Sequence, residues 1–261
     1  MKQWAKWMMA LLCCAALTAQ AAEVVLGAGD VVKISVYNNP DLGLETRVSD
    51  AGDITFPLLG AVPVKGLTVP AAEKKLSSML EQGGFLRQAQ VNMIVTSLQS
   101  AQVSVLGQVN RPGRYPLEGK RSVLEMLAQA GGATVDGSDN ITLIRKRNGR
   151  TTKEQIDIIG MVRDANLERD IDLAADDVIY VERSPRFYIY GEVQRPGSFR
   201  LERSMTVLQA LSAGGGLTAR GTERGMRVKR RGADGKEQVI DVKPDDVLLP
   251  DDVVYVKESW F

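Results

Sequence analysis

Two short basic clusters are the residues of this chain best suited to bind an anionic ligand. They comprise Arg145, Lys146 and Arg147 in one cluster, and Arg227, Lys229, Arg230 and Arg231 in the other. Guanidinium and ammonium groups form charge-assisted hydrogen bonds with carboxylates, so both clusters could attract an acidic ligand. Both also fall at expected hairpins, where lysine and arginine commonly protect exposed strand edges. The sequence alone leaves both interpretations open.

Three pairs of neighbouring aspartates invite comparison with an acid–base pair or a calcium site. They are Asp176 and Asp177, Asp245 and Asp246, and Asp251 and Asp252. Their recurrence just before equivalent predicted strands favours the hydrogen-bonded turns that aspartate commonly makes. None has the ligand spacing of a calcium loop. We therefore expect turns here, with no metal site and no catalytic carboxylate pair.

The composition excludes several kinds of chemistry. Among the 261 residues there is no histidine, which excludes Ser-His-Asp and Cys-His catalysis and histidine-ligated zinc. The glycine run 214–216 lacks the lysine of a phosphate-binding loop and follows a predicted helix, so neither a nucleotide nor another cofactor is expected. The net charge of +1 argues against nucleic acid as a partner. The composition favours a binding or scaffolding protein over an enzyme.

The first 21 residues predict a secretory signal peptide. Two lysines precede an apolar run over residues 8–19, and Ala19 and Ala21 match the small residues that a signal peptidase recognises. The run is too short for a helix that must cross roughly 30 Å of hydrocarbon. Neither Cys13 nor Cys14 follows a good lipoprotein cleavage sequence. We therefore expect cleavage after residue 21 and export of the mature chain.

An internal repeat organises the chain beyond residue 100. Residues 107–147 align without a gap with residues 191–231, and both copies contain Arg-Pro-Gly, beginning at Arg111 and Arg195. Each copy predicts a strand, a turn at Arg-Pro-Gly, a second strand, one helix, a basic hairpin and a final strand. This order packs one helix across a small mixed sheet, as in a β-grasp module. Arg111 and Arg195 either serve the turn alone or pair with acidic groups of a neighbouring subunit.

Each repeat is expected to contain one helix that starts with a capping box. The two boxes join Ser122 to Glu125 and Thr206 to Gln209. The apolar residues expected on the buried helical face are Val123, Leu124 and Leu127 in the first copy, and Val207, Leu208 and Leu211 in the second. Glycines end both helices.

The segment before the repeats is a different module. Alternating apolar residues and turn signals predict its strands, and a longer apolar stripe predicts its helix. The expected elements are strands over residues 31–37, 54–56 and 91–95, and a helix over residues 69–82. The predicted fold class is therefore α+β, with three small modules over residues 22–99, 100–183 and 184–261.

The ordered set of motifs resembles the bacterial polysaccharide export family. Residues 26–31 (LGAGDV), 37–42 (YNNPDL) and 50–60 (DAGDITFPLLG) resemble the N-terminal export domain of that family. The two repeats resemble its soluble-ligand-binding β-grasp (SLBB) domains, whose V-x-x-P-G opening is present at Val109 and Val193. The resemblance covers essentially the whole chain after the signal peptide.

The resemblance implies a periplasmic protein that is not an enzyme and that assembles into a homo-oligomeric ring. Such rings form the conduit through which capsular or extracellular polysaccharide crosses the outer membrane. The implied partners are the exported polysaccharide and an inner-membrane polysaccharide copolymerase. Under this interpretation, the two basic clusters would line a path for an acidic polysaccharide.

The sequence departs from the best-known family members at its C-terminus, where they add an amphipathic helix that crosses the outer membrane. Residues 256–261 match residues 181–186, so the sequence stops where another repeat would begin. We therefore expect a short member that docks beneath a separate outer-membrane protein, a β-barrel. Trp260 and Phe261 would either dock to such a partner or cover the core of the last module.

Two other functions stay open. A periplasmic module could bind a glycan without forming a channel, and a secreted hydrolase could cleave a glycan with two carboxylates. The hydrolase is disfavoured because no carboxylate pair outside the repeated turns stands out.

Overall fold

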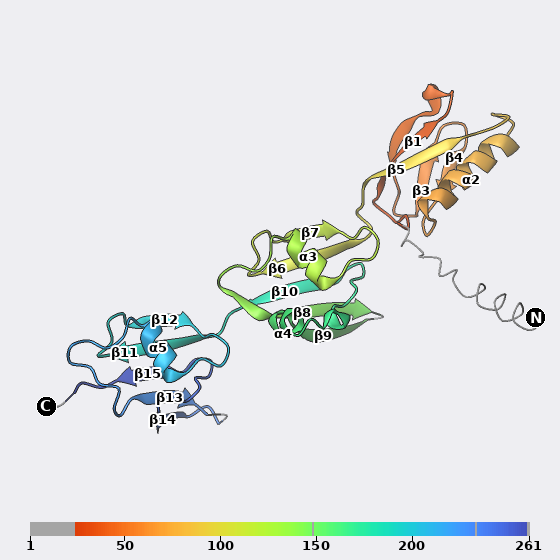
Figure 1. Ribbon diagram of the computed structural model, residues 1–261. Coiled ribbons are helices and arrows are strands. Elements are labelled where there is room, and N and C mark those ends of the chain that lie inside the picture. The colour runs from red at the N-terminus through yellow and green to blue at the C-terminus, as the bar shows by residue number, and fades with distance from the viewer. Residues whose placement is uncertain (1–23, 148, 233, 260–261) are drawn as a thin grey trace, which may run out of the picture. The chain divides into compact units, whose positions relative to one another are not determined.

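The computed structural model describes residues 24–147, 149–232 and 234–259 (Figure 1). The chain divides into two compact units. One unit comprises the residues up to Ser104 with Arg114–Met126 and Asp170–Asp177, and the other comprises Val105–Gly113, Leu127–Arg169 and Val178–Phe261. The predicted signal peptide, Trp260 and Phe261 lie outside the described residues.

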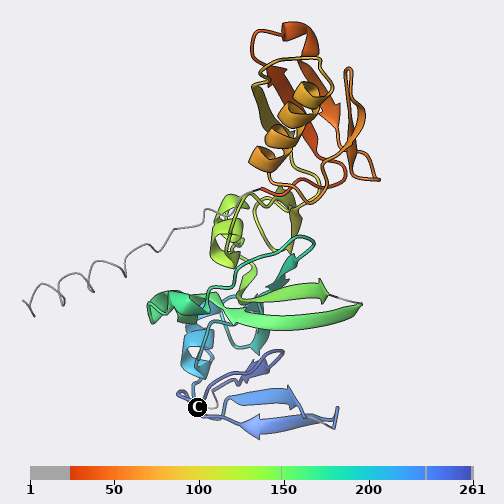
Figure 2. The same ribbon diagram turned by 90° about the vertical axis from the view of Figure 1, so that its right-hand side faces the viewer.

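The N-terminal part of the chain contains two small antiparallel sheets and one long helix. Its elements are β1 (Val31–Val36), the 3-10 helix η1 (Pro40–Leu42), β2 (Leu44–Arg47), β3 (Asp53–Phe56), β4 (Gly60–Pro63), α2 (Val69–Gln82) and β5 (Val91–Ser97). The strand orders are β2-β1-β5 and β3-β4. The helix α2 packs along β5, as both views show (Figures 1 and 2).

The helix α2 begins and ends at the predicted residues. The hydroxyl of Thr68 caps its first turn by accepting a hydrogen bond from the backbone N–H of Ala71 at 3.4 Å. The buried face consists of Ala72, Leu76 and Leu80, with Val69 and Met79 packed at its edge. Burying each leucine stabilises the fold by roughly 1.5–3 kcal/mol relative to leaving it exposed.

The first repeat folds into a five-stranded sheet with the strand order β7-β6-β10-β8-β9. Its elements are β6 (Gln102–Gly107), β7 (Gly113–Pro116), α3 (Val123–Gln129), β8 (Gly137–Arg147), β9 (Arg150–Asp157), α4 (Ile158–Arg163), the 3-10 helix η2 (Leu167–Arg169) and β10 (Val178–Arg183). The short helices α4 and η2 are not among the predicted elements, and they fill the segment by which this repeat is longer than the second.

The second repeat has the same order of strands, β12-β11-β15-β13-β14. Its elements are β11 (Arg186–Gly191), β12 (Gly197–Arg200), α5 (Val207–Ala213), β13 (Arg227–Arg231), β14 (Glu237–Asp241) and β15 (Val253–Val256). The first and last strands, β11 and β15, run parallel, whereas β11–β12, β13–β14 and β13–β15 are antiparallel. A mixed sheet covered by one helix confirms the predicted α+β class and two tandem β-grasp-like repeats (Figure 1).

A glycine ends the first strand of each repeat at a point where the last strand comes very close. Gly107 and Gly191 have φ angles of 88° and 95°, which favour glycine. A Cβ atom at either position would collide with the carbonyl oxygen of Val181 or Val256. The two repeats therefore share the same backbone contact at the centre of the sheet.

The buried face of each repeat helix differs by one residue from the predicted face. Val207 and Leu211 are buried as expected, but Leu208 is 39% exposed and Ala210 is buried in its place. Positions i, i+3 and i+4 share one side of a helix, so a helix that starts by burying Val207 turns the next residue away. The first repeat shows the same difference, because Val123, Met126 and Leu127 are buried and Leu124 is half-buried.

Candidate functional site

The outer face of the second repeat's sheet carries three tyrosines and a lysine. Side chains alternate along a strand, and Ile189, Val228 and Val254 are buried in the core shared with α5. Their neighbours in sequence therefore point outward. These outward residues are Tyr188 and Tyr190 on β11, Lys229 on β13 and Tyr255 on β15, and we call them the tyrosine–lysine face.

The members of the tyrosine–lysine face lie close together. The ring centroids of Tyr190 and Tyr255 are 5.0 Å apart, and their planes are inclined by 36°. The Nζ atom of Lys229 lies 5.7 Å from the ring centroid of Tyr190, within the range of cation–π attraction. Tyr188 and Tyr190 are 43% and 36% exposed. The face therefore presents ring surfaces and an ammonium group together.

The rest of the second basic cluster is divided between the two sides of β13. Arg227 pairs with Asp241 across the β13–β14 hairpin, with 2.9 Å between Nε and Oδ1, and Arg231 is exposed. Arg230 instead donates hydrogen bonds to both carboxylate oxygens of the fully buried Asp252, at 2.8 and 2.6 Å. These hydrogen bonds raise the pKa of the Arg230 guanidinium above its ordinary value. Arg230 thereby links the β13–β14 hairpin to the turn before β15 in the same repeat.

The first basic cluster lies at the end of β8, on a hairpin that runs out from its sheet (Figure 2). Arg145 is half-buried, whereas Lys146 and Arg147 are exposed. Ile144 pairs with Val178 as Lys229 pairs with Val253, so Arg145 has the register position of Arg230. The gapless alignment of the sequences, which matches Arg145 with Lys229, is therefore off by one residue at this hairpin. The clusters therefore correspond in register, and Lys146 and Arg147 of the first are exposed beyond that position.

The aspartate pairs before the last strands form turns, as predicted. Asp176 and Asp251 have φ angles of 66° and 65°, and the carboxylates of Asp177 and Asp252 are fully buried. Each buried carboxylate accepts a hydrogen bond at 2.8 Å from the backbone N–H three residues earlier. The pairs therefore shape the backbone before β10 and β15.

The two Arg-Pro-Gly arginines lie against the C-termini of the repeat helices. Arg111 donates a hydrogen bond from Nη2 to the carbonyl oxygen of Gln129 at 2.9 Å, and Arg195 donates one to Ala213 at 3.2 Å. These carbonyls belong to the last residues of α3 and α5, where a cation is favourable. Both arginines thus tie the turn to the helix in the same way.

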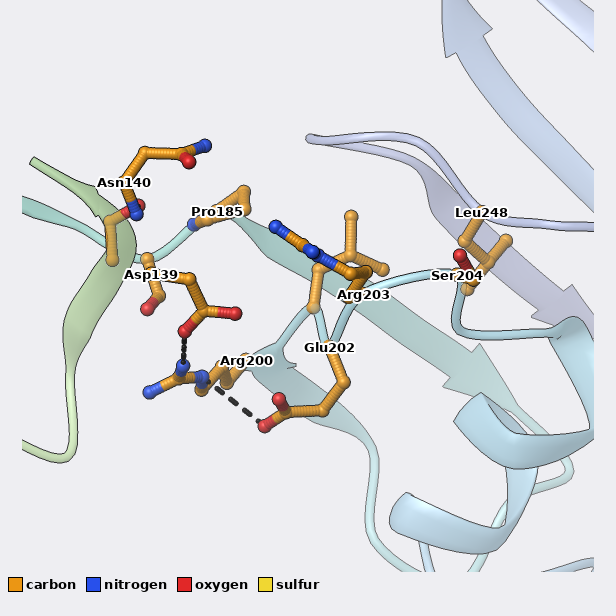
Figure 3. A pocket seen from close by; sticks show the side chains of 11 residues that line it. Asp139, Asn140, Pro185, Arg200, Glu202, Arg203, Ser204 and Leu248 are labelled. Carbon is orange, nitrogen blue, oxygen red and sulfur yellow. Dashed lines mark hydrogen bonds and ion pairs between the residues drawn. The ribbon is translucent and has the colours of Figure 1, made fainter. Parts of the chain in front are cut away.

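A small pocket of about 200 Å³ lies where the second repeat meets β8, inside the second compact unit (Figure 3). Arg200 there donates to Asp139 at 2.9 Å and to the carbonyl oxygen of Val135 at 2.6 Å, and its Nε atom lies 3.2 Å from Glu202. The charged groups of the pocket therefore pair with one another where the repeats meet, although Arg200 Nε makes no hydrogen bond with any described residue. The aligned position of Arg200 in the first repeat is Pro116.

A second ion pair supports the same junction. Arg203 donates to Asp157 at 2.6 Å, and the same carboxylate caps α4 by accepting a hydrogen bond from the backbone N–H of Gly160 at 2.9 Å. The Gly160 hydrogen bond, followed by the Arg203 hydrogen bond, lowers the pKa of Asp157 below its ordinary value. The same ion pair raises the pKa of Arg203.

Two kinds of feature are absent from the residues that the structure describes. No group of histidine, cysteine, aspartate and glutamate side chains within residues 24–147, 149–232 and 234–259 is arranged to hold a metal ion. None of the helices in this part of the chain combines the length and apolar character needed to cross a membrane.

Neither the tyrosine–lysine face nor the structural carboxylate of Asp30 was predicted from the sequence. Asp30 is fully buried and accepts hydrogen bonds from the backbone N–H groups of Gly27, Gln99 and Ser100, each at 2.8 Å, and from the Ser100 hydroxyl at 2.7 Å. It thereby joins the two ends of the N-terminal part of the chain. The signal for the tyrosine–lysine face was the alternation of tyrosine with apolar residues in β11 and β15.

Comparison with known proteins identifies the domains. Residues 18–96 match the family described as "Polysaccharide biosynthesis/export protein", and residues 102–155 and 186–241 match the SLBB domain. An export domain followed by two SLBB domains defines a class of polysaccharide export proteins. The chain belongs to this polysaccharide export family.

Relatives match along most of the chain. The EPS I polysaccharide export outer membrane protein EpsA of Ralstonia nicotianae is 27% identical over 92% of this chain and 72% of its own length. EpsA of Ralstonia solanacearum is 26% identical over 92% of this chain and 73% of its own length. The polysialic acid transport protein KpsD of Escherichia coli is 24% identical over 73% of this chain and 34% of its own length.

Proposed function

We propose that this chain is a periplasmic, non-enzymatic component of a machine that exports an exopolysaccharide or a capsule. The observation that carries the proposal is the succession of one export domain and two SLBB domains over most of the chain. The EpsA proteins, which are named for polysaccharide export, match over 92% of the chain and therefore share this succession rather than one domain.

The proposed mechanism is that of a scaffold. The chain assembles into a homo-oligomeric ring, and the ring provides a conduit that leads the polysaccharide toward the outer membrane. An inner-membrane copolymerase supplies the polymer and a separate outer-membrane protein receives it, with Trp260 and Phe261 as the docking residues. The exposed members of the basic clusters contact the polymer, and these are Lys146, Arg147, Arg227, Lys229 and Arg231.

Deleting the gene tests the export role. We expect extracellular polysaccharide to fall at least tenfold and polymer to accumulate within the cell envelope, and we expect a plasmid copy to restore export. Extracellular polysaccharide that stayed at the parental level would contradict the role.

Native mass spectrometry of the purified protein tests the ring separately. A single closed oligomer supports the conduit. A monomer that binds glycan would instead support the alternative of a periplasmic glycan-binding module, which the exposed tyrosines of the second repeat favour.

A further inference from the structure

We propose that the tyrosine–lysine face of the second repeat binds a segment of an acidic polysaccharide and that the first repeat has no equivalent site. This inference rests on the proposed export function and adds to it the charge class of the polymer and the surface that the polymer contacts.

The paired rings supply the part of the face that fits a sugar. A pyranose ring presents C–H groups on its faces, and such groups pack favourably on an aromatic ring, while tyrosine hydroxyls can hydrogen-bond to sugar hydroxyls. The rings of Tyr190 and Tyr255, whose centroids lie 5.0 Å apart, form one aromatic pair across the neighbouring strands β11 and β15. Tyr188 extends the same face along β11 and is 43% exposed.

Lys229 supplies the charge that selects an acidic polymer. Its ammonium group lies 5.7 Å from the Tyr190 ring centroid, so a carboxylate on a sugar stacked at Tyr190 would meet it directly. Lys229 forms no ion pair with any residue that the structure describes. Arg227 on the same strand is paired with Asp241, and Lys229 is the basic residue of that strand that lies beside the Tyr190 ring.

The first repeat shows that the β-grasp frame does not require this surface. Register places Ile144 where the second repeat has Lys229, and Tyr180 where it has Tyr255. Alignment at the strand-ending glycines places Leu106 at the position of Tyr190 and Ser104 at that of Tyr188. The first repeat therefore retains one tyrosine and lacks both the ring pair and the cation.

Binding of two oligosaccharide probes to the purified full chain tests the inference. We expect an alginate oligosaccharide, which carries a carboxylate on every sugar, to bind, and a neutral dextran oligosaccharide of equal length not to bind. Tyr190→Ala and Lys229→Gln should each weaken alginate binding by about tenfold. Lys229→Gln should also reduce the salt dependence of binding, because one screened charge contact is lost. The matched control is Tyr180→Ala in the first repeat, which should bind as tightly as the wild type.

Several outcomes would overturn the inference. They are the absence of alginate binding by the wild type, equal binding of dextran, and equal affinities of the wild type and both variants. A change in oligomer mass for Tyr190→Ala with unchanged affinity would assign the face to contacts between subunits and would overturn it too. Circular dichroism melting curves that match the wild type establish that the variants are folded.

Measuring polysaccharide export by cells that carry the variants distinguishes failure of this inference from failure of the proposed function. If deletion of the gene stops export and the double variant Tyr190→Ala, Lys229→Gln restores it fully, the export function stands and the inference fails. If the double variant restores export only partly while the Tyr180→Ala control restores it fully, both are supported.

Discussion

Arg230 and Asp252 form a two-point ion pair, with 2.8 Å from Nε to Oδ1 and 2.6 Å from Nη2 to Oδ2. Asp252 is fully buried and also accepts a hydrogen bond from the backbone N–H of Leu249 at 2.8 Å. One carboxylate therefore holds both the basic hairpin and the turn before the last strand. Arg230 belongs to the second basic cluster, but its role is structural, because it stabilises the fold of its own repeat.

Arg230→Met should lower the free energy of unfolding by about 2 kcal/mol, because it leaves a buried carboxylate without its counter-charge. Urea denaturation followed by circular dichroism measures the change. The matched control is Arg231→Met on the exposed neighbouring position, which should stay within about 0.5 kcal/mol of the wild type. Equal losses for the two variants would show that the ion pair adds nothing specific.

The contacts of Asp157 predict a pH dependence at the junction of the repeats. Hydrogen bonds from Gly160 and Arg203 lower the pKa of Asp157 below 3.8. The stabilisation from this carboxylate is therefore complete above pH 3.8 and is lost as the pH falls through the lowered pKa. The free energy of unfolding of Asp157→Asn should thus be lower than that of the wild type at neutral pH. In strong acid the two free energies of unfolding should become equal.

Arg203→Gln should move the pKa of Asp157 part of the way back toward its ordinary value, since the larger contribution from Gly160 remains. Carboxyl-carbon NMR titration measures that pKa. The control Arg224→Gln changes an exposed arginine of the same repeat and should leave the titration unchanged. A full return to the ordinary value in Arg203→Gln would contradict the dominant role of the Gly160 hydrogen bond.

Two glycine substitutions separate the effect of backbone conformation from that of space. Gly216 has a φ angle of 83° and no heavy atom within 4 Å of an added Cβ, so Gly216→Ala should cost about 1 kcal/mol. Gly191→Ala adds a collision with the carbonyl oxygen of Val256 and should cost more than about 3 kcal/mol. Thermal unfolding compares the variants, and similar losses would mean that the last strand moves aside easily.

A double-mutant cycle tests the junction seen in Figure 3. Arg200→Gln and Asp139→Asn should be non-additive by about 1 kcal/mol, because their side chains are only 28% and 27% exposed and lie 2.9 Å apart. The control cycle uses Arg227 and Asp241, which are equally close but 44% and 79% exposed. Its coupling should stay below about 0.5 kcal/mol. Additive losses in the first cycle would show that the ion pair does not couple the repeats.

Local patterns in the sequence predicted most of the elements. The spacing of apolar residues predicted α2 at its observed bounds. The predicted capping box of α5 is formed in both directions, at 2.9 and 3.3 Å between Thr206 and Gln209. The helix α4 was missed because it is short, and its start depends on the cap that Asp157 provides.

The candidate site was harder to predict because its residues meet through strand pairing. Lys229 and Arg230 are neighbours in sequence, yet one joins a solvent-facing surface and the other pairs with a buried carboxylate. Side chains alternate along a strand, so Lys229 and Arg230 point to opposite faces of the sheet. Only the register between β13 and β15 shows that Lys229 shares a face with Tyr255. Tyr190 reaches that face from a strand far earlier in the chain.

The shared frame of the two repeats has an evolutionary consequence. Both copies keep the strand-ending glycine, the helix-contacting arginine and the buried aspartate, whereas the outward positions differ, as at Leu106 and Tyr190. Outward side chains of a sheet do not enter the core, so a duplicated module can change them with little effect on its packing. After a duplication, one copy can therefore acquire a new surface while the other copy keeps its earlier role. Exchanging a few outward residues should likewise transfer that surface from one module to the other.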